Sequence, residues 1–126
     1  MARILVAEDD QHISRIISLW LRRNGHEITG AGDGLEAWTL VRERCPDLLV
    51  TDVNMPKMDG LELLEKVRGE GMTELPVIVM TSRCDQGEIE ARACELGAVV
   101  HPKPFSPVRL TEAIESALAA ATTSEA

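Results

Sequence analysis

The 126-residue sequence predicts an α/β fold with a doubly wound, five-stranded parallel sheet and five helices. Short apolar runs alternate five times with segments whose apolar residues recur at helical spacing, as in repeated strand–helix units. The first, third and fourth runs are apolar throughout, which is typical of strands covered by helices on both faces. The second run alternates and the fifth is very short, so both are expected at the edges. Right-handed crossovers then favour the strand order 2-1-3-4-5.

The first two strand–helix units have clear boundaries. Residues 3–7 form a continuous apolar run, and the helix after it carries Ile13, Ile17 and Leu21 on one face. Asn24-Gly25 ends this helix, because both residues tolerate the left-handed conformation found at helix ends. A weaker strand over residues 26–31 leads through a glycine-rich turn into a helix marked by Leu35, Trp38 and Val41. That helix ends at Cys45-Pro46, since a residue before proline is disfavoured in the helical conformation.

The remaining units follow the same pattern. Strands are expected over residues 47–51, 76–80 and 98–100, and the apolar residues of the helices after them recur three or four positions apart. These helix positions are Leu61, Leu64 and Val67, then Ile89, Ala93 and Leu96, then Leu110, Ile114 and Leu118. One domain is therefore expected over residues 1–120. Residues 121–126 are small and polar and are expected to form a flexible C-terminal tail.

Composition excludes several classes of protein. The chain has 13 basic and 21 acidic residues, a formal net charge of −8, and only three aromatic residues. Direct nucleic-acid binding is therefore disfavoured, because phosphate contacts need clustered basic residues and base stacking needs aromatic ones. No apolar run is long enough for membrane insertion, and no secretion signal opens the chain. Cys45, Cys84 and Cys94 lack metal-binding spacing and are expected to be reduced, buried or inert thiols of a cytoplasmic protein.

Polar residues directly follow four of the five predicted strands. Glu8 and Asp9 follow the first strand and Asp52 the third, and these strands are neighbours in the expected order. The three carboxylates should therefore converge on one crevice, where they would take up protons or bind a cation. Because no histidine or cysteine accompanies them, Mg²⁺ is favoured. The hydroxyl of Thr81 and the ammonium of Lys103 would complete a site suited to a phosphoryl group.

Asp10 is either a further member of this acidic site or the residue that caps the first helix.

Four motifs resemble the receiver domain of response regulators in bacterial two-component signalling, similar to the chemotaxis type with its flavodoxin-like fold. They are residues 4–10 (ILVAEDD), 52–60 (DVNMPKMDG), 80–82 (MTS) and 103–105 (KPF). The resemblance extends over about residues 3–120. It implies a phosphoacceptor domain that changes conformation to control a downstream protein, and no enzyme activity beyond catalysis of its own dephosphorylation.

The resemblance also implies roles for individual residues. Asp52 would accept a phosphoryl group from a sensor histidine kinase, from a phosphotransfer protein, or from a small acyl phosphate. Glu8, Asp9, Asp52 and the backbone carbonyl of Asn54 would hold Mg²⁺. Thr81 would be the switch residue that binds the phosphoryl group.

Further roles fall close to these residues. Lys103 would pair with the phosphoryl oxygens, with a cis peptide before Pro104 to aim it. Asn54 and Arg83 occupy positions that tune dephosphorylation in this family. The expected output surface is the fourth helix, the fifth strand and the fifth helix, with Arg92, His101 and Arg109 as candidates.

One segment departs from the family pattern. Receiver domains commonly read Gly-Ala-x-x-aromatic-x-x-Lys-Pro-Phe, whereas the segment from Gly97 to Lys103 is one residue shorter here. Val100 or the gap takes the place of the aromatic residue, and only His101 offers a ring. The phosphorylation chemistry is therefore expected to follow the family more closely than the usual conformational readout does.

Two alternative functions stay open. A degenerate receiver would act only as a protein-interaction module, which the shortened segment before Lys103 permits. A phosphatase with an aspartate nucleophile, like the haloacid dehalogenase superfamily, would also use an aspartate at a strand end, Mg²⁺ and a lysine. However, Asp52-Val53-Asn54 lacks the second aspartate of that superfamily, and the chain has no cap domain.

Overall fold

The computed structural model describes residues 2–81, 86–102 and 106–125, with side chains for residues 2–81, 87–101 and 106–120. Strands and helices alternate in the predicted way. The strands are β1 (Arg3–Ala7), β2 (Glu27–Ala31), β3 (Leu48–Asp52), β4 (Val77–Thr81) and β5 (Val99–Pro102). The helices are α1 (Gln11–Arg23), α2 (Gly34–Glu43), α3 (Gly60–Gly69), α4 (Gln86–Glu95) and α5 (Pro107–Glu125).

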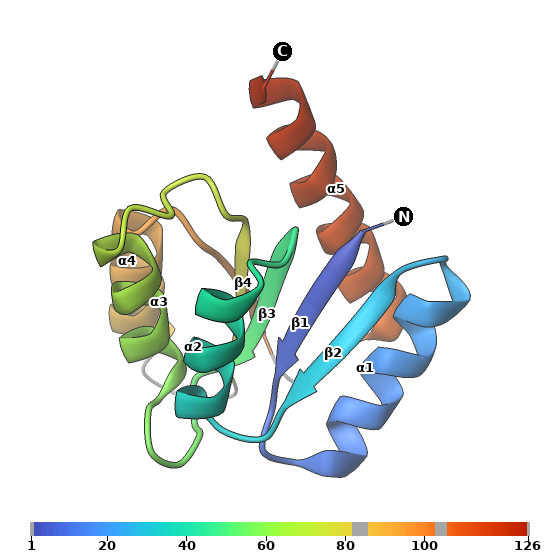
Figure 1. The fold of residues 1–126 in the computed structure, drawn as a ribbon, viewed down its shortest axis with the longest axis horizontal. Helices are drawn as coiled ribbons and strands as arrows, with labels where there is room; N and C mark the ends of the chain where they lie inside the picture. Colours follow the sequence, from blue (N-terminus) through green and yellow to red (C-terminus); the bar gives the residue numbers. More distant parts are fainter. Residues whose placement is uncertain (1, 82–85, 103–105, 126) are drawn as a thin grey trace.

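The five strands form one parallel sheet in the order β2-β1-β3-β4-β5, so the predicted fold class and strand order are confirmed. Ala7 is paired with Thr51, and Asp52 is paired with Met80. The register therefore brings the carboxyl ends of β1, β3 and β4 to the same side of the sheet, towards which Figure 1 shows the arrowheads of β1 and β2 pointing.

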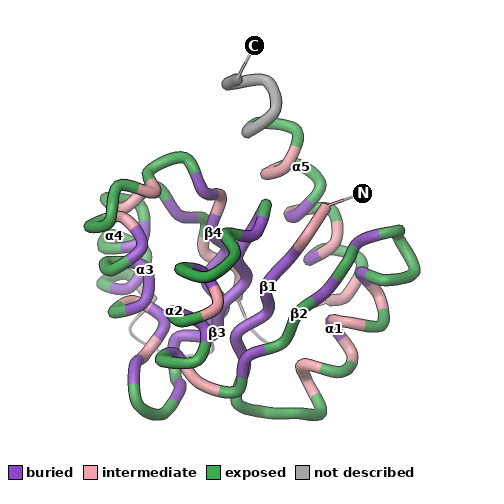
Figure 2. Tube along the Cα trace, in the orientation of Figure 1, coloured by how far each residue is buried: buried purple, intermediate pink, exposed green. Residues whose placement is uncertain are grey.

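Helices cover both faces of the sheet. Figure 1 shows α1 and α5 on one face and α2, α3 and α4 on the other. Successive strand residues alternate between the two faces of the sheet. Leu5 and Leu49 therefore pack in the core between the sheet and α2, α3 and α4. Ile4 and Val50 pack in the core between the sheet and α1 and α5. The three central strands are buried along nearly their whole length, as their continuous apolar sequences predict (Figure 2).

Three aspartates cap the helices that begin at the carboxyl edge of the sheet. Asp10 accepts hydrogen bonds from the first turn of α1, and Asp33 accepts one from the first turn of α2. Asp59 caps α3, and Glu62 donates its own amide to Asp59 while its carboxylate accepts the Asp59 amide. Each cap contributes about 1 kcal/mol by satisfying amides that the helix leaves unpaired. The three caps thus fix where α1, α2 and α3 start at the carboxyl ends of the strands.

Arg68, near the end of α3, joins three segments at the amino ends of the strands. Its guanidinium donates to the backbone carbonyls of Met72 at 2.7 Å and Leu75 at 2.8 Å, in the connection to β4. It also donates to the carbonyls of Leu96 and Gly97, in the turn between α4 and β5. Burial lowers the pKa of this guanidinium, because desolvation disfavours its charged form. Arg68 therefore fastens the C-terminal end of α4 to α3.

Several details differ from the sequence predictions. β5 extends to Pro102, two residues beyond the predicted strand, because its pairing with β4 continues to Thr81. The helix α5 continues to Glu125, so the backbone is helical in the segment predicted as a tail, and its flexibility stays a prediction. In the described part of the chain, no helix combines the length and hydropathy needed to cross a membrane.

Two of the three cysteines are described by the structure. Cys45 and Cys94 are free thiols, as expected for reduced cysteines, and both are exposed, so neither is buried. Cys45 directly precedes Pro46 after the end of α2, and Cys94 lies in α4, whose buried face is made by Ile89 and Ala93. Cys84 lies outside the described residues.

Candidate functional site

Three carboxylates meet at the carboxyl edge of the sheet. Glu8 and Asp9 follow β1, and Asp52 is the last residue of β3. One oxygen from each carboxylate lies within 4.8 Å of the others. Glu8 and Asp52 are only 2% and 6% exposed, whereas Asp9 is exposed. The predicted convergence is therefore present in the structure, as an acidic cluster in which Glu8 and Asp52 are buried and Asp9 is open to solvent.

The chain around Glu8 explains how this side of the crevice is built. The Glu8 amide donates to the Ala31 carbonyl at 3.0 Å, which continues the pairing of β1 with β2. A Glu8 carboxylate oxygen accepts the Asp10 amide at 3.2 Å, while the Asp10 carboxylate caps α1. Of the two readings of Asp10 that the sequence allows, the helix cap is the one that the structure shows.

The backbone on both sides of Asp52 is held by several contacts. The Val53 amide donates to the Met80 carbonyl on β4, and the Thr51 hydroxyl donates to the Asp52 carbonyl, each at 3.0 Å. The Gly60 amide donates to the Val53 carbonyl at 2.9 Å, so the loop over residues 53–59 returns to its starting point. A Cβ atom on Gly60 would lie 2.2 Å from the Asp52 carbonyl oxygen. Gly60 is therefore needed for this close approach.

The same loop also contacts α2, which the sequence analysis did not predict. A Cβ atom on Gly34 would lie 1.9 Å from the Met58 carbonyl oxygen. Lys57, with a φ of 70°, is the one non-glycine residue in the described part of the chain with a positive φ. Its ammonium lies 3.7 Å from the Asp33 carboxylate. A glycine at the first position of α2 is the only sequence signal of this contact, because glycine is a poor helix former.

The other predicted site residues lie partly within the described chain. Thr81 is fully buried at the end of β4, where it is paired with Pro102 of β5. Asn54 is exposed and stands two residues after Asp52. Lys103, Pro104 and Arg83 lie outside the described residues. The structure thus brings the three carboxylates together and places Thr81 at the end of the strand beside Asp52.

The register of β5 decides which residue takes the place of the missing aromatic side chain. Val100 is paired with Val79 and packs against the core cluster to which α4 contributes Ile89 and Ala93. His101 is paired with Met80, whose side chain packs against α1 and α5, so the imidazole faces the opposite side of the sheet. Val100 therefore occupies the position that faces α4, and His101 does not supply a ring there.

His101 is expected to make the stability of the fold depend on pH. Burial lowers its pKa from the ordinary value of 6.5, and the positive charge of Arg109 lowers it further. Because the folded pKa lies below the unfolded one, the stability contributed by neutral His101 is complete above 6.5 and is lost as the pH falls towards the folded pKa. Urea unfolding at about pH 7.5 and about pH 5.5 should show a smaller loss of stability for His101→Gln than for the wild-type chain.

A His12→Gln variant, changed at an exposed position of α1, is the control for removal of a histidine. Equal losses of stability in the wild-type and His101→Gln chains would contradict the prediction.

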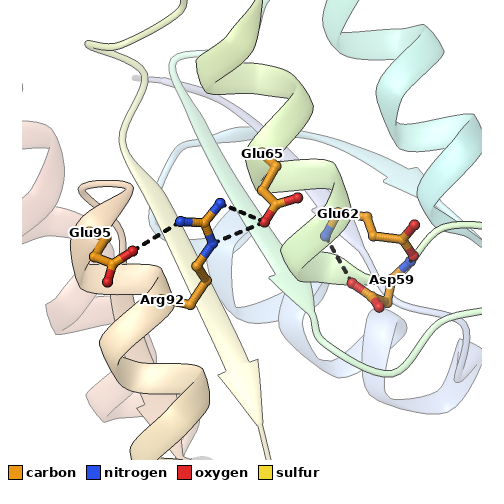
Figure 3. A network of polar contacts seen from close by, with 5 residues as sticks. All are labelled: Asp59, Glu62, Glu65, Arg92 and Glu95. Atoms are coloured by element: carbon orange, nitrogen blue, oxygen red, sulfur yellow. Dashed lines mark hydrogen bonds and ion pairs between the residues drawn. The ribbon is translucent and has the colours of Figure 1, made fainter.

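Arg92 links α4 to α3 (Figure 3). Its guanidinium donates twice to one carboxylate oxygen of Glu65 on α3, at 2.8 and 2.9 Å, and once to Glu95 at 2.9 Å. These hydrogen bonds, first with Glu65 and then with Glu95, raise the pKa of the guanidinium. Arg92, a candidate for the output surface, is thus engaged with α3 in this structure.

Comparison with known proteins identifies the family to which this arrangement belongs. A family model described as the response regulator receiver domain matches residues 4–115, which is most of the chain. The chain belongs to this family. Receiver domains of response regulators are signalling domains of two-component systems, and the family resemblance found in the sequence motifs is therefore confirmed.

Two curated relatives show the same relationship. Response regulator MprA of Mycobacterium tuberculosis is 40% identical over 105 residues, which cover 82% of this chain and 45% of MprA. Transcriptional regulatory protein PdtaR of the same organism is 38% identical over 118 residues, covering 92% of this chain and 56% of PdtaR. This receiver domain thus spans about half the length of the curated relatives that it matches.

Solved structures agree with the fold. A CheY-like response regulator receiver domain from Methanospirillum hungatei superposes with a TM-score of 0.92 at 26% identity, covering 98% of each chain. The receiver domain of the Francisella response regulator 1452 gives a TM-score of 0.87 at 31% identity, covering 94% of this chain and 97% of the other. The receiver domain described here therefore has the flavodoxin-like arrangement of that family.

Proposed function

We propose that this receiver domain accepts a phosphoryl group on Asp52 and uses the change to control a protein partner. The observation that carries the proposal is the cluster of Glu8, Asp9 and Asp52, with one oxygen of each within 4.8 Å of the others at the edge of a receiver fold. Asp9 and Asn54 are exposed, so a phosphodonor can approach this edge from solvent. Asp52 is buried at the end of β3, in the middle of the sheet.

The proposed transfer is a displacement at phosphorus. A carboxylate oxygen of Asp52 attacks the phosphorus of a phosphohistidine on a sensor histidine kinase or a phosphotransfer protein. The new P–O bond forms as the P–N bond breaks, and the leaving imidazole nitrogen takes a proton from water. With acetyl phosphate as donor, acetate is the leaving group.

The donor set at this edge fits a Mg²⁺ ion. Three carboxylates without a histidine or cysteine in the cluster are hard oxygen ligands, and the exposure of Asp9 leaves room for water on the remaining positions. Glu8, Asp9, Asp52 and the backbone carbonyl of Asn54 are the proposed ligands. When bound, Mg²⁺ offsets the negative charge of the transferring phosphoryl group.

Two further side chains complete the proposal. Lys103 would pair with the phosphoryl oxygens, and the Thr81 hydroxyl would bind one of them and carry the change into β4 and the segment after it. The output would then be a contact with a downstream protein. The net charge of −8 supports a protein partner rather than direct nucleic-acid binding by this stretch of chain.

Phosphoryl uptake by the wild-type chain is the direct test. Incubation with acetyl phosphate and Mg²⁺, followed by cold acid quenching and intact-mass measurement, should show the gain of one phosphoryl group. A sample treated with a chelator should show none, because the charge of the phosphoryl group is then not offset. If neither sample gains mass and Mg²⁺ binding is also absent, the degenerate interaction module becomes the better reading.

A further inference from the structure

The loop after Asp52 rests on the first turn of α2 without space between the two backbones. An ideal Cβ atom on Gly34 would lie 1.9 Å from the Met58 carbonyl oxygen, 2.7 Å from its carbonyl carbon and 2.8 Å from its Cβ. Gly34 and Met58 are both buried. Because the nearest atoms belong to the Met58 backbone, no rotation of a side chain could make room for a larger residue.

A second contact joins the same two segments at the surface. Asp33 caps α2 through a 2.7 Å bond from the Glu36 amide, and its carboxylate also lies 3.7 Å from the Lys57 ammonium. Lys57 has a left-handed backbone conformation, which costs energy for a residue with a side chain. The loop is therefore strained at Lys57, next to its contacts with Asp33 and Gly34, and these two contacts offset part of that strain.

We propose that Gly34 is a positioning residue for divalent-cation binding at the carboxylate cluster. It acts through the loop over residues 53–59, which follows Asp52 and contains Asn54. The contact of Gly60 with the Asp52 carbonyl joins the two ends of this loop, and the contact of Met58 with Gly34 holds a point within it. A side chain at position 34 displaces Met58, and the displacement is taken up by the residues between Asp52 and Met58.

This inference rests on the proposed function for the role of Asn54, whose carbonyl is a proposed Mg²⁺ ligand. It adds an element that does not touch the cation: the start of α2, which belongs to a different strand–helix unit from the cluster. Supporting groups around metal ligands typically change metal affinity by about ten- to a hundredfold when they are altered.

The test compares two glycine substitutions. Gly34→Ala should weaken Mg²⁺ binding, measured by isothermal titration calorimetry on the full chain, by about tenfold or more. Gly69→Ala is the matched control, because Gly69 ends α3 in an exposed position and no atom lies within 4 Å of its added Cβ. Its Mg²⁺ affinity should equal that of the wild-type chain. A folded Gly34→Ala variant with wild-type affinity would overturn the inference.

Hydrogen exchange without added Mg²⁺ separates this inference from the proposed function. Amides of residues 53–59 should exchange faster in Gly34→Ala than in Gly69→Ala or the wild-type chain. If the wild-type chain binds no Mg²⁺, the proposed function fails, and unchanged exchange in this loop would overturn the positioning role by itself.

Asp33→Asn provides a variant that should fold even if Gly34→Ala does not. Asparagine caps a helix as well as aspartate does, so this change removes the attraction to Lys57 and keeps α2 capped. We expect Mg²⁺ affinity to fall about two- to threefold at low salt, with a smaller difference at high salt because exposed charges are screened. If Gly34→Ala is unfolded and Asp33→Asn has wild-type affinity and exchange, the inference is wrong.

Discussion

An Asp52→Asn variant is expected to take up no phosphoryl group from acetyl phosphate under conditions in which the wild-type chain gains one. A neutral amide is a poor nucleophile towards phosphorus, whereas the carboxylate of Asp52 attacks directly. The amide also supplies a weaker ligand for Mg²⁺, since it lacks the negative charge. Because the two side chains have nearly the same shape, the fold should be retained, with an unfolding transition in urea as cooperative as that of the wild-type chain.

Asp47→Asn is the matched control for this experiment. Asp47 stands at the opposite edge of the sheet, where its carboxylate accepts the Arg3 amide at 2.8 Å, and an asparagine oxygen accepts the same bond. This variant should gain one phosphoryl group like the wild-type chain. Intact mass after acid quenching measures the gain in all three proteins, and uptake by a folded Asp52→Asn chain would remove Asp52 from the role of phosphoacceptor.

A Gly60→Ala variant is expected to lose about 3–4 kcal/mol of stability, near the upper end for a single substitution. The added methyl group would meet the Asp52 carbonyl oxygen at 2.2 Å and the Val53 Cα at 3.0 Å, and neither can rotate away. Shifting the Asp52 backbone would also strain the hydrogen bond that its carbonyl accepts from Thr51. The loss therefore comes from a contact between two backbone segments.

Urea unfolding of Gly60→Ala and Gly69→Ala isolates this contact. Both glycines belong to α3, but a Cβ atom on Gly69 meets nothing within 4 Å. Gly69→Ala should therefore change stability by no more than about 1 kcal/mol, and in the stabilising direction, because alanine favours the helix. Similar unfolding midpoints for the two variants would show that the Asp52 carbonyl yields to a methyl group at little cost.

The sequence predicts the sheet and the acidic cluster well, and the reason is physical. A continuous apolar run has only one stable use in a chain of this pattern, as a strand covered on both faces, and parallel strands end at a common edge. Glu8 and Asp52 therefore meet once β1 and β3 are known to be neighbours. The helix caps Asp10, Asp33 and Asp59 act through bonds to amides two or three residues away, so short-range sequence is enough to suggest them.

Contacts between distant backbone segments could not be predicted from the sequence. The seat of Met58 on Gly34 joins residues 24 positions apart, and it leaves no periodic pattern that a reader of the sequence could detect. The left-handed conformation of Lys57, the residue before Met58, is likewise not marked by any pattern in the sequence. The orientation of Val100 and His101 also needed the structure, because a shift of one residue in a strand moves a side chain to the other face of the sheet.

The attachment of α4 has a mechanical consequence. At its C-terminal end, Arg68 donates to the carbonyls of Leu96 and Gly97 from a partly desolvated position, where charged hydrogen bonds are strong. Nearer the middle of α4, the link to α3 is the exposed ion pair between Arg92 and Glu65. Exposed ion pairs of this kind contribute little to stability in water. Of these two links to α3, the one at the C-terminal end of α4 is therefore the stronger. Loss of the Arg92 pair alone should leave that end of the helix in place.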